Sequence, residues 1–238
     1  LKPKPVRLGL DVDGVMYQQV RALRNYLVNR YGYVPAELPD ASIWNYFNDW
    51  AREPGSQEPM PAREWMQHMI DSVVDGQLLW QGEAYSEMVE AVHYTANNCR
   101  QAGIGLEIVV VTNRHLKGVE SACEDATRQW LGRHFGGGII SDIVFSADKT
   151  VIEADVFVED NLLNYATLRE AGTRALLYAQ PWNHSIRGLR EFAETYPHVL
   201  REGLVGGVID PADVLDPVTA MPSGRLWVAV SEAAGVAV

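Results

Sequence analysis

Two aspartates, two positions apart, are the residues of this 238-residue chain whose types and spacing most directly suggest chemistry. Asp11 and Asp13 follow alternating apolar residues over 6–10, a pattern typical of a β-strand. Side chains two apart in an extended chain point to the same side, so both carboxylates project together beyond the strand end. Gly14 then permits a sharp turn. Folding does not require two like charges there, whereas a bound cation would explain them.

This pair of acids is also compatible with two kinds of loop. One is a solvated turn in which the carboxylates are incidental. The other is a calcium-binding EF-hand loop, which also begins Asp-x-Asp. Met16 and Val20 stand where such a loop needs ligands, and Ala22 occupies the twelfth position, where it needs Glu. The calcium-loop interpretation therefore fails.

More polar residues follow other apolar runs that predict strands. Thr112 ends the β-branched run 106–112, and Lys149 follows the short apolar run 143–146. Glu159 and Asp160 end the run 155–160. Ligands in parallel α/β sheets bind at the carboxyl ends of the strands, so we expect these side chains to gather with the two aspartates at one edge of the sheet.

The elements that position these residues alternate between strand and helix. Helical spacing of apolar residues appears in 83–102, 116–135, 161–171 and 186–196, between or after predicted strands at 6–10, 106–112, 143–146, 155–160 and 174–178. This order predicts an α/β fold with a doubly wound parallel sheet. Segments 18–31, 41–51 and 62–75 predict an all-helical insert after the first strand.

We expect a core formed by residues 1–14 and 81–210, with the insert spanning 15–80. Residues 205–209 are a candidate edge strand. The rest, 211–238, is expected to form a C-terminal tail that is loose after Met221.

The opening Asp-x-Asp-Gly resembles motif I of the haloacid dehalogenase (HAD) superfamily, and the later strand ends resemble its other three motifs in the same order. The resemblance implies that Asp11 is the nucleophile that forms an aspartyl-phosphate. Asp13 would protonate the leaving group and then activate water. Thr112 would bind a phosphoryl oxygen, and Lys149 would hold Asp11 and the phosphate together. Taken alone, Thr112 is better explained as a strand residue and Lys149 as a surface residue, and it is their placement at predicted strand ends that favours a functional role.

The same resemblance implies a Mg2+ cofactor. Its ligands would be the carboxylates of Asp11 and Asp160 and the backbone carbonyl of Asp13, with Glu159 acting through water. Asn164, one helical turn beyond Asp160, would orient that carboxylate, unless it is an ordinary helix-surface residue.

The helical insert, residues 78–82 and residues 179–183 together resemble the 5′(3′)-deoxyribonucleotidases. That resemblance implies a nucleoside monophosphate substrate under a closing helical cap. Asn113 and Arg114 are candidate phosphate donors, although Arg114 is equally a candidate surface residue. Aromatic side chains that could stack on a base, or form the core of the insert instead, are Trp44, Phe47, Trp50, Trp65 and Trp80.

The composition of the chain limits the classes of binding partner and the cellular setting that we expect. The net charge of −11 and the lack of a Lys/Arg-rich run argue against binding a nucleic-acid polymer. Cys99 and Cys123 form no ligand-spaced pair, and no apolar run reaches about 18 residues, so we expect a cytoplasmic protein without a membrane span. A homodimer is compatible with the sequence. The alternatives are a HAD phosphatase for another small phosphoester or for nucleic-acid ends, and a non-catalytic HAD-fold binding protein.

Overall fold

A parallel β-sheet forms the centre of the molecule. The computed structural model describes residues 4–76, 78–196, 213–216 and 222–236. Its strands are β1 (Val6–Leu10), β2 (Leu106–Thr112), β3 (Asp142–Phe145), β4 (Val156–Glu159), β5 (Arg174–Tyr178) and β6 (Val214–Leu215). Within these ranges the strand order is β3-β2-β1-β4-β5-β6, and every neighbouring pair is parallel. The predicted α/β fold is confirmed.

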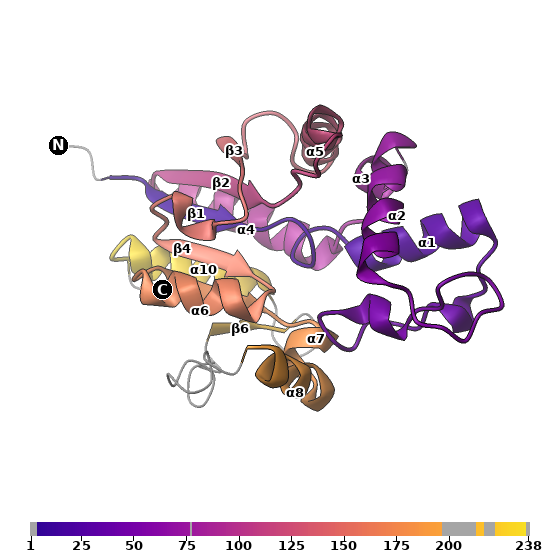
Figure 1. Ribbon diagram of the computed structural model, residues 1–238. Coiled ribbons are helices and arrows are strands. Elements are labelled where there is room, and N and C mark those ends of the chain that lie inside the picture. Colours follow the sequence, from indigo (N-terminus) through magenta and orange to yellow (C-terminus); the bar gives the residue numbers. More distant parts are fainter. Residues whose placement is uncertain (1–3, 77, 197–212, 217–221, 237–238) are drawn as a thin grey trace.

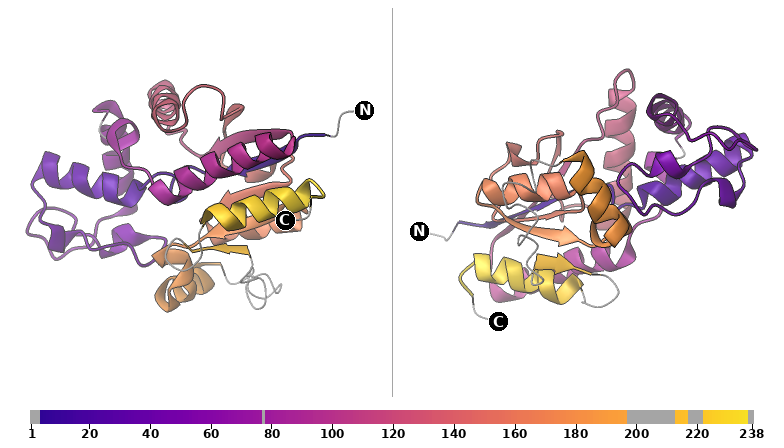
Figure 2. Two further views of the ribbon diagram at one scale, coloured as in Figure 1. Left: turned by 180° about the vertical axis from the view of Figure 1, so that it is seen from behind. Right: turned by 60° about the horizontal axis from the view of Figure 1, so that its bottom comes forward.

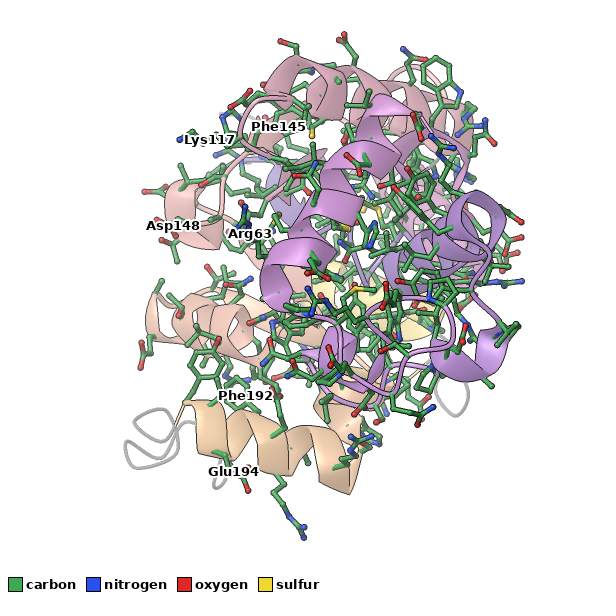
Figure 3. The ribbon with its side chains drawn as sticks, turned by 45° about the vertical axis from the view of Figure 1, so that its right-hand side comes forward. Arg63, Lys117, Phe145, Asp148, Phe192 and Glu194 are labelled. Carbon is green, nitrogen blue, oxygen red and sulfur yellow. The ribbon has the colours of Figure 1, made fainter. Side chains whose placement is uncertain are left out.

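Helices cover both faces of the sheet (Figures 1 and 2). Helix α4 (Ser86–Ala102) and helix α10 (Pro222–Ala233) pack side by side on one face, while α6 (Leu162–Glu170) and α8 (Ile186–Thr195) cover the other. Alternation along the strands serves both layers: Val110 and Val158 join the α4 side, and Val111 and Phe157 join the α6 side. Phe192 points from α8 toward the body of the protein, opposite to Glu194 (Figure 3).

The insert, which we call the cap (residues 15–80), lies at one end of the sheet (Figure 1). Its elements are α1 (Gln19–Tyr31), the 3-10 turns η1 (Pro35–Glu37) and η2 (Tyr46–Asp49), α2 (Ala62–Val74) and most of α3 (Leu78–Gln81). The helix expected over 41–51 is only the short turn η2. Trp50 is 1% exposed, and its indole N–H donates to the Pro39 carbonyl at 2.9 Å, which anchors this turn inside the cap.

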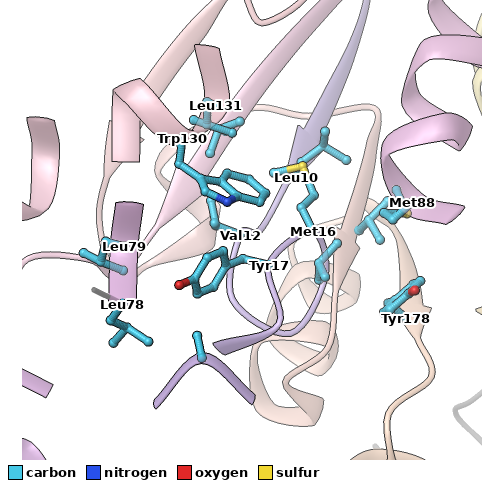
Figure 4. Packing of buried hydrophobic residues seen from close by; sticks show 14 of the residues in the cluster. Leu10, Val12, Met16, Tyr17, Leu78, Leu79, Met88, Trp130, Leu131 and Tyr178 are labelled. Atoms are coloured by element: carbon cyan, nitrogen blue, oxygen red, sulfur yellow. The ribbon is translucent and has the colours of Figure 1, made fainter. Parts of the chain in front are cut away.

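Two chain segments connect the cap to the sheet and pair with each other. The Gln18 N–H donates to the Glu83 carbonyl at 3.0 Å, and the Tyr85 N–H donates to the Met16 carbonyl at 2.8 Å. Between them the Tyr17 ring is fully buried and meets the ring of Trp130 on α5 (Glu120–Phe135) edge-on at 5.2 Å (Figure 4). The connection between cap and core is therefore packed as well as hydrogen-bonded.

A second contact joins the cap to α8. The guanidinium of Arg187 donates to the Ser42 hydroxyl at 2.7 Å and to the Asp49 carboxylate at 2.8 Å. The Asn45 amide donates to the Glu191 carboxylate at 2.6 Å. These polar contacts hold cap residues 42–49 against the core.

The C-terminal part differs from the expectation of a loose tail. Residues Pro222–Ala233 form α10, in which Leu226 and Val230 are fully buried in the core cluster. The candidate strand 205–209 lies outside the described residues. Within the described ranges no helix is long and apolar enough to span a membrane.

Candidate active site

Three carboxylates meet at the carboxyl edge of the sheet. Strands β1 and β4 are parallel neighbours, so residues beyond their ends adjoin. One oxygen from each of Asp11, Glu159 and Asp160 lies within 4.8 Å of the others. All three side chains are buried, which makes the cluster costly without a cation. The predicted convergence of Asp11 and Asp160 is therefore present.

Lys149 faces the first of these acids from the short 3-10 turn η3 (Lys149–Val151). Its ammonium donates to Asp11 Oδ1 and to the Val111 carbonyl, both at 2.7 Å. Asp148 caps the turn by accepting from the Thr150 N–H at 2.8 Å. Burial opposes the charge, but the carboxylates of Asp11 and Glu159 raise the pKa of Lys149, so the amine is a cation.

The two acids at the end of β4 are engaged differently. Glu159 accepts from the backbone N–H groups of Asp160 and Asn161 at 3.0 and 2.9 Å and from the Asn164 amide at 3.2 Å. Asp160 Oδ1 is buried without a hydrogen-bond partner among the described residues. Asp160 thus has an oxygen free to bind a metal directly, whereas the oxygens of Glu159 are already engaged by other donors. Asn164 orients Glu159 instead of Asp160, which differs from the expectation.

Burial dominates the electrostatics of this cluster. It raises the pKa of Asp11 and of Asp160 and raises that of Glu159 to about 7, with further contributions from the neighbouring carboxylates. A divalent cation would reverse these shifts, because it favours the charged form of each ligand. The donor set, all oxygen with one buried oxygen free, fits Mg2+.

The segment after β5 supports Asp160 and was not singled out, residue by residue, in the sequence. The indole N–H of Trp182, in α7 (Pro181–His184), donates to Asp160 Oδ2 at 2.9 Å. The Asn183 amide donates to the Asp160 carbonyl at 2.7 Å, and the Gln180 amide donates to the Gly14 carbonyl at 2.6 Å. The sequence did place these residues just beyond a predicted strand end, which is where ligands bind in such sheets. In the sequence analysis, however, segment 179–183 served only as part of the family resemblance.

Gly14 brings the first strand's turn close to this acid. Its φ is +81°, and a Cβ there would overlap the Asp160 carboxylate. Only glycine therefore permits this approach of the backbone to Asp160.

Arg114 faces Asp13, although the sequence suggested a phosphate donor or a surface residue. Its Nε and Nη2 donate to Asp13 Oδ2 and Oδ1 at 2.9 and 2.7 Å. The residue is 3% exposed, so the surface interpretation is wrong. Burial acts against its charge, but the ion pair with Asp13 raises the pKa of Arg114. Asn113 beside it is exposed and lines the cavity between core and cap that is described below, where it could contact a ligand.

Thr112 completes the strand-end residues. It is fully buried at the end of β2, next to the strand that carries Asp11. Its hydroxyl has no hydrogen-bond partner in the part of the chain that the structure describes. An unpartnered buried hydroxyl of this kind is a candidate for a ligand contact, although Thr112 is not among the residues that line the cavity described below.

A cavity of about 440 Å³ lies between these residues and the cap, within the usual range for small-ligand sites. Asp11, Asp13, Lys149 and Asp160 line its core side. The cap side chains that line it are mainly apolar or aromatic: Val20, Trp44, Tyr46, Phe47, Trp65, Met66 and Met69.

Of the cap aromatic residues that the sequence offers for base stacking, some line the cavity and others do not. Trp44, Phe47 and Trp65 face the cavity, and the rings of Phe47 and Trp65 lie 5.1 Å apart. Trp50 is buried in the cap, and Trp80 is 42% exposed outside the cavity wall. Tyr46, which the sequence did not single out, is a further lining residue.

Comparisons with known proteins agree with this geometry. Residues 4–201 match the family model "5' nucleotidase, deoxy (Pyrimidine), cytosolic type C protein". The Chlorobaculum tepidum protein named "Putative 5'(3')-deoxyribonucleotidase" is 26% identical over 185 residues, covering 77% of this chain and 83% of that protein.

Solved structures give weaker likenesses. The D,D-heptose 1,7-bisphosphate phosphatase of Burkholderia thailandensis matches with a TM-score of 0.44 and 15% identity, over 93% of this chain and 96% of that one. A hydrolase of Streptococcus pneumoniae matches with a TM-score of 0.42 and 11% identity, over 81% of this chain and 100% of that one.

The family assignment rests on the family model, which spans most of the chain, and the phosphatase activity rests on that assignment. The chain belongs to the 5′ nucleotidase, deoxy (pyrimidine), cytosolic type C family and is a phosphomonoester hydrolase built on a HAD-like α/β core.

Proposed function

We propose that this chain removes phosphate from deoxynucleoside monophosphates through an aspartyl-phosphate on Asp11, with Mg2+ as cofactor. The observation that carries the proposal is the position of Asp11: it lies beside Lys149 and Asp160 at the floor of a cavity whose opposite wall is aromatic. The floor has the charges that a phosphate needs, and the wall has the surfaces that a base needs.

Mg2+ would be held by the carboxylates of Asp11 and Asp160 and by the Asp13 carbonyl, with Glu159 behind them. The free Oδ1 of Asp160 supports this assignment. When bound, the ion would neutralise negative charge on the phosphoryl oxygens and on its carboxylate ligands.

The residues of the chain account for both halves of the reaction. Asp11 forms a bond to phosphorus as the bond to the nucleoside oxygen breaks, and Asp13 gives its proton to that oxygen. Asp13 then takes a proton from the water that attacks phosphorus, and the bond to Asp11 breaks. Lys149 and the Thr112 hydroxyl stabilise charge on the phosphoryl group.

The cap supplies selectivity for a nucleotide. Base–aromatic stacking contributes about 1–3 kcal/mol per base, and Trp44, Phe47 and Trp65 present rings to the cavity. Asn113, at the cavity wall, would donate to the phosphate. The name of the Chlorobaculum tepidum relative and the family description support a deoxyribonucleotide.

The test is phosphate release from a panel of substrates by the wild type and by Asp11→Asn, with and without Mg2+. The panel holds deoxy- and ribonucleoside monophosphates, a sugar phosphate and an oligonucleotide with a terminal phosphate. We expect turnover of deoxynucleotides that needs Mg2+ and is lost in Asp11→Asn. Undiminished turnover by Asp11→Asn would refute the mechanism, and preference for the sugar phosphate or the oligonucleotide would refute the substrate assignment.

The sequence also predicts a cytoplasmic setting, which the two buried free thiols Cys99 and Cys123 support. A homodimer stays a prediction, and sedimentation of the purified chain tests it.

A further inference from the structure

The ion pair between Arg114 and Asp13 has a geometry that phosphate binding does not explain. We propose that Arg114 is a positioning residue, which holds the Asp13 carboxylate in the orientation needed for its acid–base role. This inference rests on the proposed function, because it takes Asp13 as the group that moves protons.

The contact is bidentate and connects parts of the chain that are far apart. Arg114 Nε and Nη2 reach the two oxygens of Asp13 at 2.9 and 2.7 Å, although the residues are separated by 101 positions. A planar guanidinium fork fixes the plane of a carboxylate as well as its distance. Each oxygen still has a lone pair outside the fork, and Asp13 lines the cavity, so the carboxylate stays available to a ligand.

Arg114 is itself held in place by its surroundings. Its guanidinium carbon lies 4.4 Å from the centre of the Tyr17 ring, a cation–π contact. Nη1 approaches the Thr127 hydroxyl at 3.4 Å, and that hydroxyl donates to the Cys123 carbonyl at 2.7 Å. The side chain of Arg114 is 3% exposed, against 20% for that of Asp13. Both residues line the cavity, but the cation is the more deeply buried member of the pair and is held by further contacts, whereas the carboxylate is the more accessible member.

Each of the two aspartates, Asp11 and Asp13, therefore pairs with its own basic side chain. Lys149 bonds to Asp11 at 2.7 Å and Arg114 bonds to Asp13. Without Arg114, the Asp13 carboxylate would be free to turn toward the Lys149 ammonium or toward a bound metal. Either movement would take it from the leaving oxygen and from the attacking water.

This role makes a kinetic prediction that depends on the leaving group. A nucleoside alkoxide must be protonated as it leaves, whereas p-nitrophenolate is a weak base and leaves without a proton. Hydrolysis of the phosphoenzyme needs Asp13 as a base with either substrate. A displaced Asp13 therefore slows both steps for a nucleotide but only the second step for p-nitrophenyl phosphate.

The experiment uses Arg114→Lys, which keeps the charge but cannot form the fork. We expect kcat for a deoxynucleoside monophosphate to fall roughly 10- to 100-fold, a part of the ~10²–10⁴ that a general acid–base group contributes. With p-nitrophenyl phosphate, stopped-flow should show a burst of p-nitrophenolate at close to the wild-type rate and then turnover slowed by a similar factor. Arg114→Ala should behave likewise and regain turnover when methylguanidinium is added.

The matched control is Arg128→Lys, because Arg128 lies on α5, is half-exposed and pairs with Glu124 instead of a cavity residue. Equal slowing of the burst and of steady turnover, with KM raised for both substrates, would mean that Arg114 binds phosphate and would overturn the proposal. Wild-type kinetics in Arg114→Lys would also overturn it. Should Arg114→Ala not fold, the Lys variant decides alone.

Asp13→Asn separates this inference from the proposed function. Wild-type turnover of the nucleotide by Asp13→Asn would refute the acid–base mechanism itself, and the positioning role with it. An impaired Asp13→Asn beside an unimpaired Arg114→Lys would refute only the role of Arg114.

Discussion

Replacement of Trp182 by Phe tests how the protein positions its metal ligand. The indole N–H donates to Asp160 Oδ2 at 2.9 Å, and both side chains are buried. Phe removes the donor, so Asp160 loses the bond that fixes the orientation of its carboxylate. The donated hydrogen bond also lowers the pKa of Asp160, against the effect of burial. Its loss would therefore let protons compete more strongly with the metal for this carboxylate.

The magnitude follows from the charged hydrogen bond. Such bonds contribute about 1.5–3 kcal/mol, and about 1.4 kcal/mol corresponds to a factor of ten in affinity. We therefore expect Mg2+ to bind roughly 10- to 100-fold more weakly, which is also the usual effect of removing a group that supports a metal ligand.

The assay is a Mg2+ titration followed by calorimetry and by the shift in unfolding temperature. Trp50→Phe is the matched control, because Trp50 also donates its indole N–H, to the Pro39 carbonyl, but lies inside the cap. Both variants should lower the unfolding temperature, and only Trp182→Phe should weaken Mg2+ binding. Mg2+ affinity within twofold of the wild type in Trp182→Phe would refute the reasoning.

Three further results are expected. Since burial raises the pKa of Glu159 to about 7, the unfolded chain binds fewer protons than the folded one between about pH 4.5 and 7, and the metal-free protein should lose stability as pH rises through this range. Mg2+ should raise the unfolding temperature more at pH 8 than at pH 5, because protons no longer compete with it for the carboxylates. Melting curves measured over a series of pH values, with and without Mg2+, check both results. In Gly82→Ala the new methyl group would overlap the Tyr17 side chain, so the free energy of unfolding measured in urea should fall by about 1–3 kcal/mol. Gly132 lies in a helix with open space around it, so Gly132→Ala should instead raise the free energy of unfolding by up to about 1 kcal/mol. Arg187→Ala should release cap residues 42–49 and raise KM for a nucleotide by up to about fivefold, given the ~1 kcal/mol of an exposed ion pair. KM for a sugar phosphate, which has no aromatic ring to stack on the cap, should not change.

Some features of this protein were determined by the sequence alone. The acids at 11, 13 and 160 and the lysine at 149 follow short apolar runs, and parallel strands bring such positions to one edge whatever the loops between them do. The α/β class and the helical insert follow from hydrophobic periodicity, a local property of the chain. For this reason the convergence of Asp11, Asp160 and Lys149 could be predicted from the order and spacing of the residues.

Other features were decided only by the tertiary structure. Arg114 could have met phosphate, solvent or a carboxylate; its partner Asp13 was settled by the packing of α5 and the cap connection around it. Which cap aromatics face the cavity, and that Trp182 supports Asp160, likewise depend on contacts between distant segments. Periodicity tells which face of an element is apolar, but the partner of a buried side chain depends on how separate elements pack in three dimensions, and a local pattern does not contain that information.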